Sequence, residues 1–370
     1  MVLLSQHMGL LWVGMEATTL MCAPLIYYHR HHHSLEAAWK FMMICSVGLG
    51  LALLGTMFLA MSVDQKTSLE VPFLFNEFMA HSESLDPFWL HAAFIFIVVG
   101  YGTKMGLAPM HTWLPDAHSQ APSPVSALLS GALLNCAFLG ILRMWQIMVA
   151  GGHGAFANDI LIAFGLISMI IAAVFLLHQA EYKRMLAYSG VENMGIMAVG
   201  LGLGGNAIYG ALLHTANHSL IKAGLFLVSG NILRHFETRQ QKQVTGAMRI
   251  IPASSVLWIV GLLGITGTPP FGLFISKFII LREVVDQGHI WLAALFLFLL
   301  AVIFVAMMSS MLPMVQGTPP AHAKEARHEH WSLVVPAAVL LFLGLLLGVY
   351  QPTGFVRLLE TITQAMGGGI

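Results

Sequence analysis

The sequence has 370 residues, of which 57% are hydrophobic and only 9% are charged. A soluble domain averages about 25% charged residues, so this composition, with a mean hydropathy of +0.78, indicates an all-α integral membrane protein. Seventeen basic side chains balance seventeen acidic ones, which leaves no electrostatic basis for nucleic-acid binding.

The cysteines and glycines give no support for a cofactor site. Cys22, Cys45 and Cys136 lie in apolar runs without CxxC spacing, whereas an iron–sulfur cluster needs about four ligands. We expect the three thiols to pack in the core. No glycine-rich phosphate loop follows a predicted strand. We therefore expect no cofactor in this chain, and any redox chemistry should belong to partner subunits.

Apolar runs of about 20 residues predict membrane-spanning helices. We find ten such runs, at roughly 8–28, 38–62, 88–108, 125–149, 158–179, 184–203, 207–233, 252–286 (broken at Pro269-Pro270), 289–313 and 331–351. The sequence therefore predicts a bundle of about ten transmembrane helices in the lipid bilayer.

The loops between these runs alternate between basic and acidic. One set contains most of the basic residues, namely Arg30, Lys183, Arg184, Arg234, Arg239, Lys242, Arg249, Lys324 and Arg327. The 64–86 loop of the other set has five acidic side chains and one lysine. Basic loops remain in the cytoplasm, so this asymmetry predicts a multi-pass protein with both termini outside.

The first two runs carry ionisable residues that need an explanation. Glu16 lies in the middle of the first run, where it is either a structural polar group or a functional one. Lys40 opens the second run near the cytoplasmic side, where a long cation can reach the interface. The histidine-rich stretch 29–33 precedes it. We interpret that stretch as a solvated loop and predict no metal site, because no carboxylate or cysteine set converges on it.

The third run ends in an unusual polar break. Lys104 lies inside it, and Pro109 interrupts it shortly afterwards. A lysine at membrane depth costs roughly 2.5–3.5 kcal/mol, and a broken helix is tolerated only around a cavity or inside packed protein. The pattern indicates a protonatable site, although a lysine reaching out from a helix end is the alternative. His111, Asp116 and His118 follow as supporting polar groups.

Further titratable groups recur in the second half of the chain. Lys183 opens the sixth run, as a topology signal or a proton relay, and Glu192 lies about two and a half turns further on. His214, His218 and Lys222 are spaced i, i+4 and i+8, which stacks them on one helix face about 6 Å apart. Such a face suits a proton relay, although a single intramembrane histidine is often a helix–helix hydrogen bond.

A second break precedes another intramembrane lysine. The stretch 267–272, GTPPFG, interrupts the eighth run shortly before Lys277, which could also be a lysine held at a helix end. Two interrupted segments, each with one cation, are typical of inverted-repeat transporters. We therefore divide the chain into an incomplete first repeat (1–150), a second repeat (151–315) and a C-terminal loop and helix (316–370).

The stretch KMGLAPMHTWLPDAHSQAPSPVSALLSG, residues 104–131, carries a family resemblance. It resembles the antiporter-like membrane subunits shared by NADH:quinone oxidoreductase, Mrp cation/proton antiporters and membrane-bound hydrogenases. Within this superfamily, the amino-acid sequence is most similar to subunits of the hydrogenase-4 component F type, followed by those of formate hydrogenlyase. Members of that family normally carry about four more helices ahead of the first run, so we expect this chain to lack the N-terminal helices.

The resemblance assigns roles to the polar residues. It implies that Glu16 pairs with Lys104 and that Lys277 ends the second half-channel. It also implies that Lys183 and the His214, His218, Lys222 face form a central polar axis. One departure concerns Ser130 and Asn135, which stand where many relatives have a lysine or histidine. Neither titrates, although either could order water.

The resemblance implies a proton-translocating subunit in the cell inner membrane. Electron transfer in nickel–iron hydrogenase and iron–sulfur partner subunits, or in an NADH:quinone oxidoreductase, would supply the energy. The main alternative is an Mrp-type cation/proton antiporter that works without redox partners. A purely structural subunit is a third possibility, and the lack of cofactor ligands disfavours a fourth, a quinone-reducing enzyme.

Overall fold

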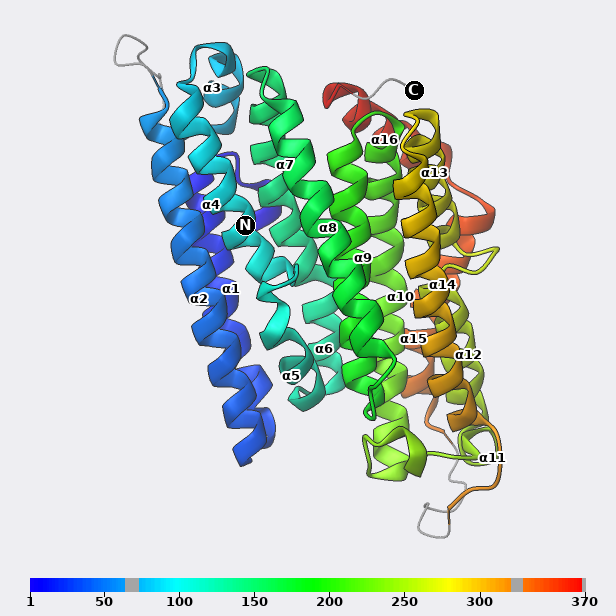
Figure 1. Cartoon of the computed structure of the whole chain (residues 1–370). Helices are drawn as coiled ribbons and strands as arrows, with labels where there is room; N and C mark the ends of the chain where they lie inside the picture. Colours follow the sequence, from blue (N-terminus) through cyan, green and yellow to red (C-terminus); the bar gives the residue numbers. More distant parts are fainter. Residues whose placement is uncertain (64–72, 321–328, 368–370) are drawn as a thin grey trace.

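The computed structural model describes residues 1–63, 73–320 and 329–367. Long helices run side by side in it and form a bundle (Figure 1). Within these ranges there is no β-strand, only two isolated bridges, His7 to Leu74 and Glu181 to Gln240. Seven helical segments in the described ranges are long and apolar enough to cross a membrane. The predicted all-α membrane class is thereby confirmed, while the total of ten spans remains a prediction.

The helices follow the predicted runs closely. The long ones are α1 (Met8–Ile26), α2 (His32–Met61), α4 (Pro87–Met105), α7 (Leu134–Ala150), α8 (Gly154–Leu176), α9 (Tyr182–Leu203), α10 (Asn206–Phe236), α12 (Pro252–Thr266), α13 (Gly272–Asp286), α14 (Ile290–Val315) and α15 (Trp331–Val349). The short ones are α3 (Phe75–Ala80), α5 (Trp113–Gln120), α6 (Ser123–Leu128), α11 (Ala247–Ile250) and α16 (Thr353–Ala365). A π-helical turn, Leu129–Leu133, joins α6 to α7.

Two features differ from the sequence expectations. Helix α2 begins at His32 rather than near residue 38, because His31 and Ser34 form a reciprocal capping box. Lys40 therefore lies two turns inside a helix instead of opening it. Helix α16, an amphipathic segment after the last apolar run, was not predicted because it is too polar to register as a span.

The first predicted break is present between α4 and α5. Helix α4 ends at Gly106, whose positive φ of 83° suits glycine, and a cis Ala108-Pro109 bond follows. The break leaves backbone groups without helical hydrogen bonds. A neighbouring helix supplies a partner for one of them, since the Ala108 amide donates to Ser168 Oγ on α8 at 2.9 Å. The chain can break here because the break is surrounded by protein.

The second predicted break lies between α12 and α13. Gly267, with φ of 80°, ends α12, and a cis Pro269-Pro270 bond precedes α13. A side chain at Gly267 would come within 3.0 Å of the Lys277 Cδ atom, so glycine also makes room for this lysine. The second break thus shapes the environment of the second intramembrane cation.

Helix α9 is the polar centre of the bundle. Every residue of α9 except Arg184 is buried, and the helix packs against α8, α10, α5, α13 and α14. Protein rather than lipid surrounds its polar groups, which is the condition for keeping them at membrane depth. By contrast, outer helices expose large apolar side chains such as Phe298 on α14 and Phe342 on α15. These faces suit contact with lipid.

The two ends of the bundle have different character. Figure 1 shows α5, α6 and α11 at one end and α3 and α16 at the other. Loops predicted to share the basic side meet at the first end, where Arg239 donates to Gln120 Oε1 at 2.8 Å. Residues 64–72 of the acidic loop, together with Lys324 and Arg327, lie outside the described residues. Assignment of the basic end to the cytoplasm remains a prediction.

Helices α2 and α4 approach closely through small residues. A Cβ atom on Gly100 would lie 2.5 Å from the Ala52 amide nitrogen and 2.6 Å from the Gly48 carbonyl oxygen. Helix association in membranes depends on such close backbone contact. This crossing positions the end of α4, and with it Lys104, against α1 and α2.

We expect Gly100→Ala to lower the free energy of unfolding by about 1–3 kcal/mol, because the added methyl forces the two backbones apart. Thermal unfolding of the detergent-solubilised protein measures the change. Gly50→Ala on α2 is the matched control, since a Cβ there meets nothing within 4 Å. Equal melting temperatures for both variants would contradict the proposed role of this crossing.

Candidate functional site

Lys104 lies in a fully buried pocket between α1, α2 and α4. Its ammonium donates a 2.8 Å hydrogen bond to Thr19 Oγ1 and lies 4.5 Å from the centroid of the Phe41 ring. Among the described residues, no carboxylate forms an ion pair with it. A hydroxyl and an aromatic face thus hold the first intramembrane cation.

Glu16 and Lys104, the pair that the resemblance implies, form no salt bridge with each other in this structure. Glu16 Oε1 instead accepts a 2.7 Å hydrogen bond from Ser46 Oγ, and its Oε2 is buried without a partner. Thr19 lies one turn further along α1 and is the group that reaches the ammonium. Both residues face the same α1–α2 interface, and the coupling between them stays a prediction.

Lys277 forms a buried ion pair with Glu192. Its ammonium lies 2.9 Å from Glu192 Oε1, with side-chain exposures of 6% and 1%. The 267–272 break brings the lysine beside the middle of α9. We predicted both residues as site residues but not their pairing, since 85 positions separate them. Glu192 is thus the direct partner of a cation rather than a peripheral group.

A hydrogen-bonded chain extends from this pair. Asn193 Nδ2 donates to Glu192 Oε2 at 2.9 Å, and Asn193 Oδ1 lies 2.9 Å from His214 Nε2. The other ring nitrogen of His214, Nδ1, lies 2.9 Å from Ser276 Oγ on α13. The structure therefore links α9, α10 and α13 through polar groups with no exposed surface. Sequence analysis did not identify Asn193 or Ser276.

The histidine face of α10 continues this chain. The rings of His214 and His218 are nearly parallel, with centroids 6.4 Å apart, as the i, i+4 spacing predicts. Both ring nitrogens of His218 are buried without hydrogen-bond partners. One turn further on, Lys222 donates to Ser189 Oγ at 2.7 Å and to the Leu186 carbonyl. The three predicted residues thus lie on one buried face.

His118 lies close to the same face. Its ring stacks on Phe226 with centroids 4.7 Å apart, and the Lys222 ammonium lies 5.7 Å from the same Phe226 ring. Both nitrogens of His118 are buried and without partners. A residue predicted only as supporting thus lies beside the axis. It offers a further ring with two free nitrogens next to Lys222.

Lys183 and Asn135 have structural partners. The buried Lys183 ammonium donates a 2.7 Å hydrogen bond to the Ala121 carbonyl, at the carboxyl end of α5, where a cation is favoured. Asn135 Nδ2 donates to Ser219 Oγ at 2.5 Å, and its Oδ1 is unpartnered. Asn135 therefore contacts α10 next to His218, where it can order water.

A polar cleft of about 460 Å³ opens at the basic end of the bundle. In it Asp116 accepts from Lys40 at 3.0 Å and from Arg184 at 3.0 Å, and Lys40 also pairs with Glu36 at 2.7 Å. The other lining residues include Glu181, which accepts from Ser119 Oγ at 2.7 Å. Lys40 and Asp116 therefore lie in an open ionic cluster, not on the buried axis.

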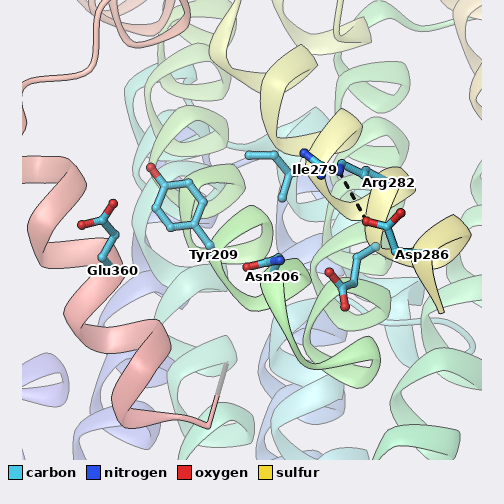
Figure 2. Close-up of a pocket in the computed structure, with 7 residues that line it drawn as sticks. Asn206, Tyr209, Ile279, Arg282, Asp286 and Glu360 are labelled. Atoms are coloured by element: carbon cyan, nitrogen blue, oxygen red, sulfur yellow. Dashed lines mark ion pairs between the residues drawn. The ribbon is translucent and has the colours of Figure 1, made fainter. Parts of the chain in front are cut away.

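A second polar pocket, of about 280 Å³, lies at the opposite end, between α10, α13 and α16 (Figure 2). Asp286 and Arg282 form an ion pair of 3.4 Å there, and Glu283 and Glu360 also line the pocket. Arg282 and Asp286 lie beyond Lys277 along α13. A pocket with ionisable lining residues thus lies near each end of the bundle.

Arg143 was missed by sequence analysis. It lies on α7 with 7% exposure, donates to the Ser5 carbonyl, and lies 5.7 Å from the centroid of the Phe75 ring. An isolated arginine in the fourth run was a signal that could have found it. His111, predicted as supporting, is buried and lies edge-on against the stacked rings of Phe175 and Tyr188.

One cluster at the basic end could hold a metal ion. Single ligand atoms of His32, His33 and Glu36 lie within 4.8 Å of one another. The sequence-based argument that no carboxylate converges on the histidine-rich stretch was therefore wrong, because α2 starts early enough to bring Glu36 onto the same helix face.

We expect Glu192→Gln and Lys277→Met each to lower the free energy of unfolding by about 3–5 kcal/mol, because each leaves one buried charge unpaired. The double variant should lose less than the sum of the two. Denaturant unfolding of the purified protein measures this coupling. On the same helix, Arg282→Met breaks an exposed pair with Asp286 and should leave stability unchanged within error. Additive losses at Glu192 and Lys277 would show that the pair contributes nothing.

Comparison with known proteins gives the family of this chain. Residues 5–304 match the family model described as NADH:quinone oxidoreductase/Mrp antiporter, TM. The hydrogenase-4 component F homolog of Methylacidiphilum infernorum is 35% identical over 362 residues, 96% of this chain and 74% of that protein. A Na(+)/H(+) antiporter subunit of Alkalihalophilus pseudofirmus is 32% identical over 292 residues, which is 75% of this chain and 35% of that protein.

Solved structures share the fold. A chain of the archaeal membrane-bound sulfane sulfur reductase superposes with a TM-score of 0.87 at 22% identity, covering 98% of this chain and 72% of that one. A chain of the Mrp complex from Dietzia sp. DQ12-45-1b gives 0.85 at 19% identity, covering 99% and 74%. Together with the sequence matches, these findings establish that the chain belongs to the NADH:quinone oxidoreductase/Mrp antiporter family of membrane subunits.

Proposed function

We propose that this chain is a proton-translocating subunit of a hydrogenase-4 or formate hydrogenlyase type complex, or of a related NADH:quinone oxidoreductase. The match to the hydrogenase-4 component F homolog supports this choice, because it extends over 96% of the chain. In this proposal other membrane subunits bind alongside, and nickel–iron hydrogenase and iron–sulfur subunits supply the energy. The chain lies in the cell inner membrane, with its basic end cytoplasmic and both termini external.

The observation that carries the proposal is the buried polar chain along α10. It runs from the Lys277–Glu192 pair through Asn193 to His214, and onward by His218 to Lys222. Steps of about 6 Å between i and i+4 side chains are within reach of one bridging water. Imidazole and ammonium groups can both accept and release a proton, so these groups suit stepwise proton transfer.

In this proposal the pockets at the two ends of the bundle are the entry and the exit of the proton path. Protons would enter from the cleft that contains Asp116 and Lys40, and pass by Lys183 and His118 to the α10 face. They would leave from Lys277 toward the acidic pocket beside Glu360 (Figure 2). Lys104 and Glu16 would respond to the neighbouring redox subunits. In this scheme the predicted repeats, 1–150 and 151–315, contain one broken helix each, with Lys104 beside the first break and Lys277 beside the second.

A second candidate is an Mrp-type cation/proton antiporter that works without redox partners. The 32% identity to the Na(+)/H(+) antiporter protein of Alkalihalophilus pseudofirmus, over 75% of this chain, favours it. The same axis would then exchange protons for sodium. Proteoliposomes containing this chain with sodium on one side and no redox substrate separate the candidates, since only the antiporter should acidify or alkalinise the lumen under these conditions.

We expect His218→Phe to reduce proton uptake to the level of protein-free vesicles, because phenylalanine neither titrates nor orders water. His218→Gln, which can still hold a water molecule, should retain part of the flux. Uptake is measured with a pH-sensitive dye in proteoliposomes containing the assembled complex.

His91→Phe is the matched control for that experiment. His91 lies near the start of α4, away from the α10 face, and its Nε2 lies 3.1 Å from His153 Nδ1. Its replacement should leave flux unchanged. Normal uptake by the His218→Phe variant would mean that protons bypass this face, and the three residues would then be helix-packing groups.

A further inference from the structure

Three consecutive histidines, His31, His32 and His33, lie at the start of α2, and His33 lines the basic-end cleft. They do not have equivalent roles. His31 caps the helix, since its Nδ1 accepts from the Ser34 amide at 3.1 Å while Ser34 Oγ accepts from the His31 amide at 3.1 Å. His32 and His33 lie inside the helix, and both side chains are exposed. Their ring nitrogens form no hydrogen bond with any described residue. Their ring nitrogens are therefore free to bind a ligand.

Helical spacing adds a carboxylate to this pair. Glu36 follows His32 by four residues and His33 by three, so the three side chains share one face. One ligand atom from each lies within 4.8 Å of the others. The rings of His32 and His33 meet edge to face, with centroids 5.8 Å apart. Two imidazoles and one carboxylate thus converge on a single point beside the cleft.

We propose that His32, His33 and Glu36 form a binding site for one divalent transition-metal ion of the Zn²⁺ class. Two neutral imidazoles and a carboxylate are a donor set that Zn²⁺ uses in proteins, with water in the fourth position. Bond lengths of about 2.0–2.2 Å require the three ligand atoms to move somewhat closer together. Rotation of three exposed side chains supplies this movement without any change in the backbone.

The site is coupled to the cleft through Lys40. Without a metal ion, Glu36 pairs with the Lys40 ammonium at 2.7 Å, and Lys40 also contacts Asp116 at 3.0 Å. A bound metal ion competes with Lys40 for the Glu36 carboxylate and leaves Lys40 to Asp116 alone. It also adds two positive charges at a rim where Arg184 and Arg239 already lie. Metal binding should therefore slow the uptake of protons or other cations through the cleft, a consequence that rests on the proposed function.

Zn²⁺ titration of the full purified chain in detergent, in competition with a chromogenic chelator, tests the site itself. We expect one bound ion per chain, and at least a tenfold weaker affinity for both His33→Ala and Glu36→Gln. His29→Ala is the control, because His29 lies in the preceding turn outside the cluster. The affinity of this variant for Zn²⁺ should equal that of the wild type. Lys40→Met should bind severalfold more tightly, because it frees Glu36 from its competing cation.

The possible results separate cleanly. Unchanged affinity in either His33→Ala or Glu36→Gln, or a loss in His29→Ala, overturns the site. Unchanged or weaker binding by Lys40→Met overturns the competition for Glu36. Proton uptake by proteoliposomes with Zn²⁺ on the cleft side tests the consequence, and inhibition in the wild type but not in His33→Ala supports it. Normal uptake with Zn²⁺ bound overturns the regulation alone, whereas absent uptake before Zn²⁺ is added counts against the proposed function and not the site.

Discussion

Burial of ionised groups at membrane depth is the constraint on which this structure depends. An unpaired charge there is expensive, and the Lys277–Glu192 pair meets the cost by direct contact. That contact needs the 267–272 break, which ends α12 and starts α13 with Lys277 facing α9. It also needs an α9 that is protected from lipid on nearly every side. The fold of the second half can thus be understood as the support for one buried ion pair.

The two lysines beside the helix breaks, Lys104 and Lys277, are held in different ways. Lys277 has a carboxylate partner, whereas Lys104 has a hydroxyl and an aromatic face, and the nearby Glu16 is bound to Ser46. A hydroxyl stabilises the charged and the neutral amine alike, because it can donate or accept. Lys104 therefore suits a position whose charge changes during function, and a small movement of α1 could exchange Thr19 for Glu16 as its partner.

Much of this arrangement could be predicted from local sequence, and the rest depends on tertiary contacts. Pro109 and Pro269 revealed both breaks, and the i, i+4, i+8 spacing placed His214, His218 and Lys222 on one face. By contrast, no local pattern relates Glu192 to Lys277 or Lys104 to Thr19, since each pair is about 85 positions apart. The ionic partners of Asp116, Lys40 and Arg184, could not be predicted either, because they come from other helices.

The central claim is that the buried ion pair and the histidine face of α10 belong to one proton path. Asn193 is the bridge, since its amide contacts both Glu192 and His214. Proton uptake by proteoliposomes containing the Asn193→Leu complex tests this most directly. Leucine is close in size but cannot hydrogen-bond, so the account predicts that flux is lost while assembly and redox turnover persist. Wild-type flux in this variant would contradict the account, because protons would then reach Lys277 by another route.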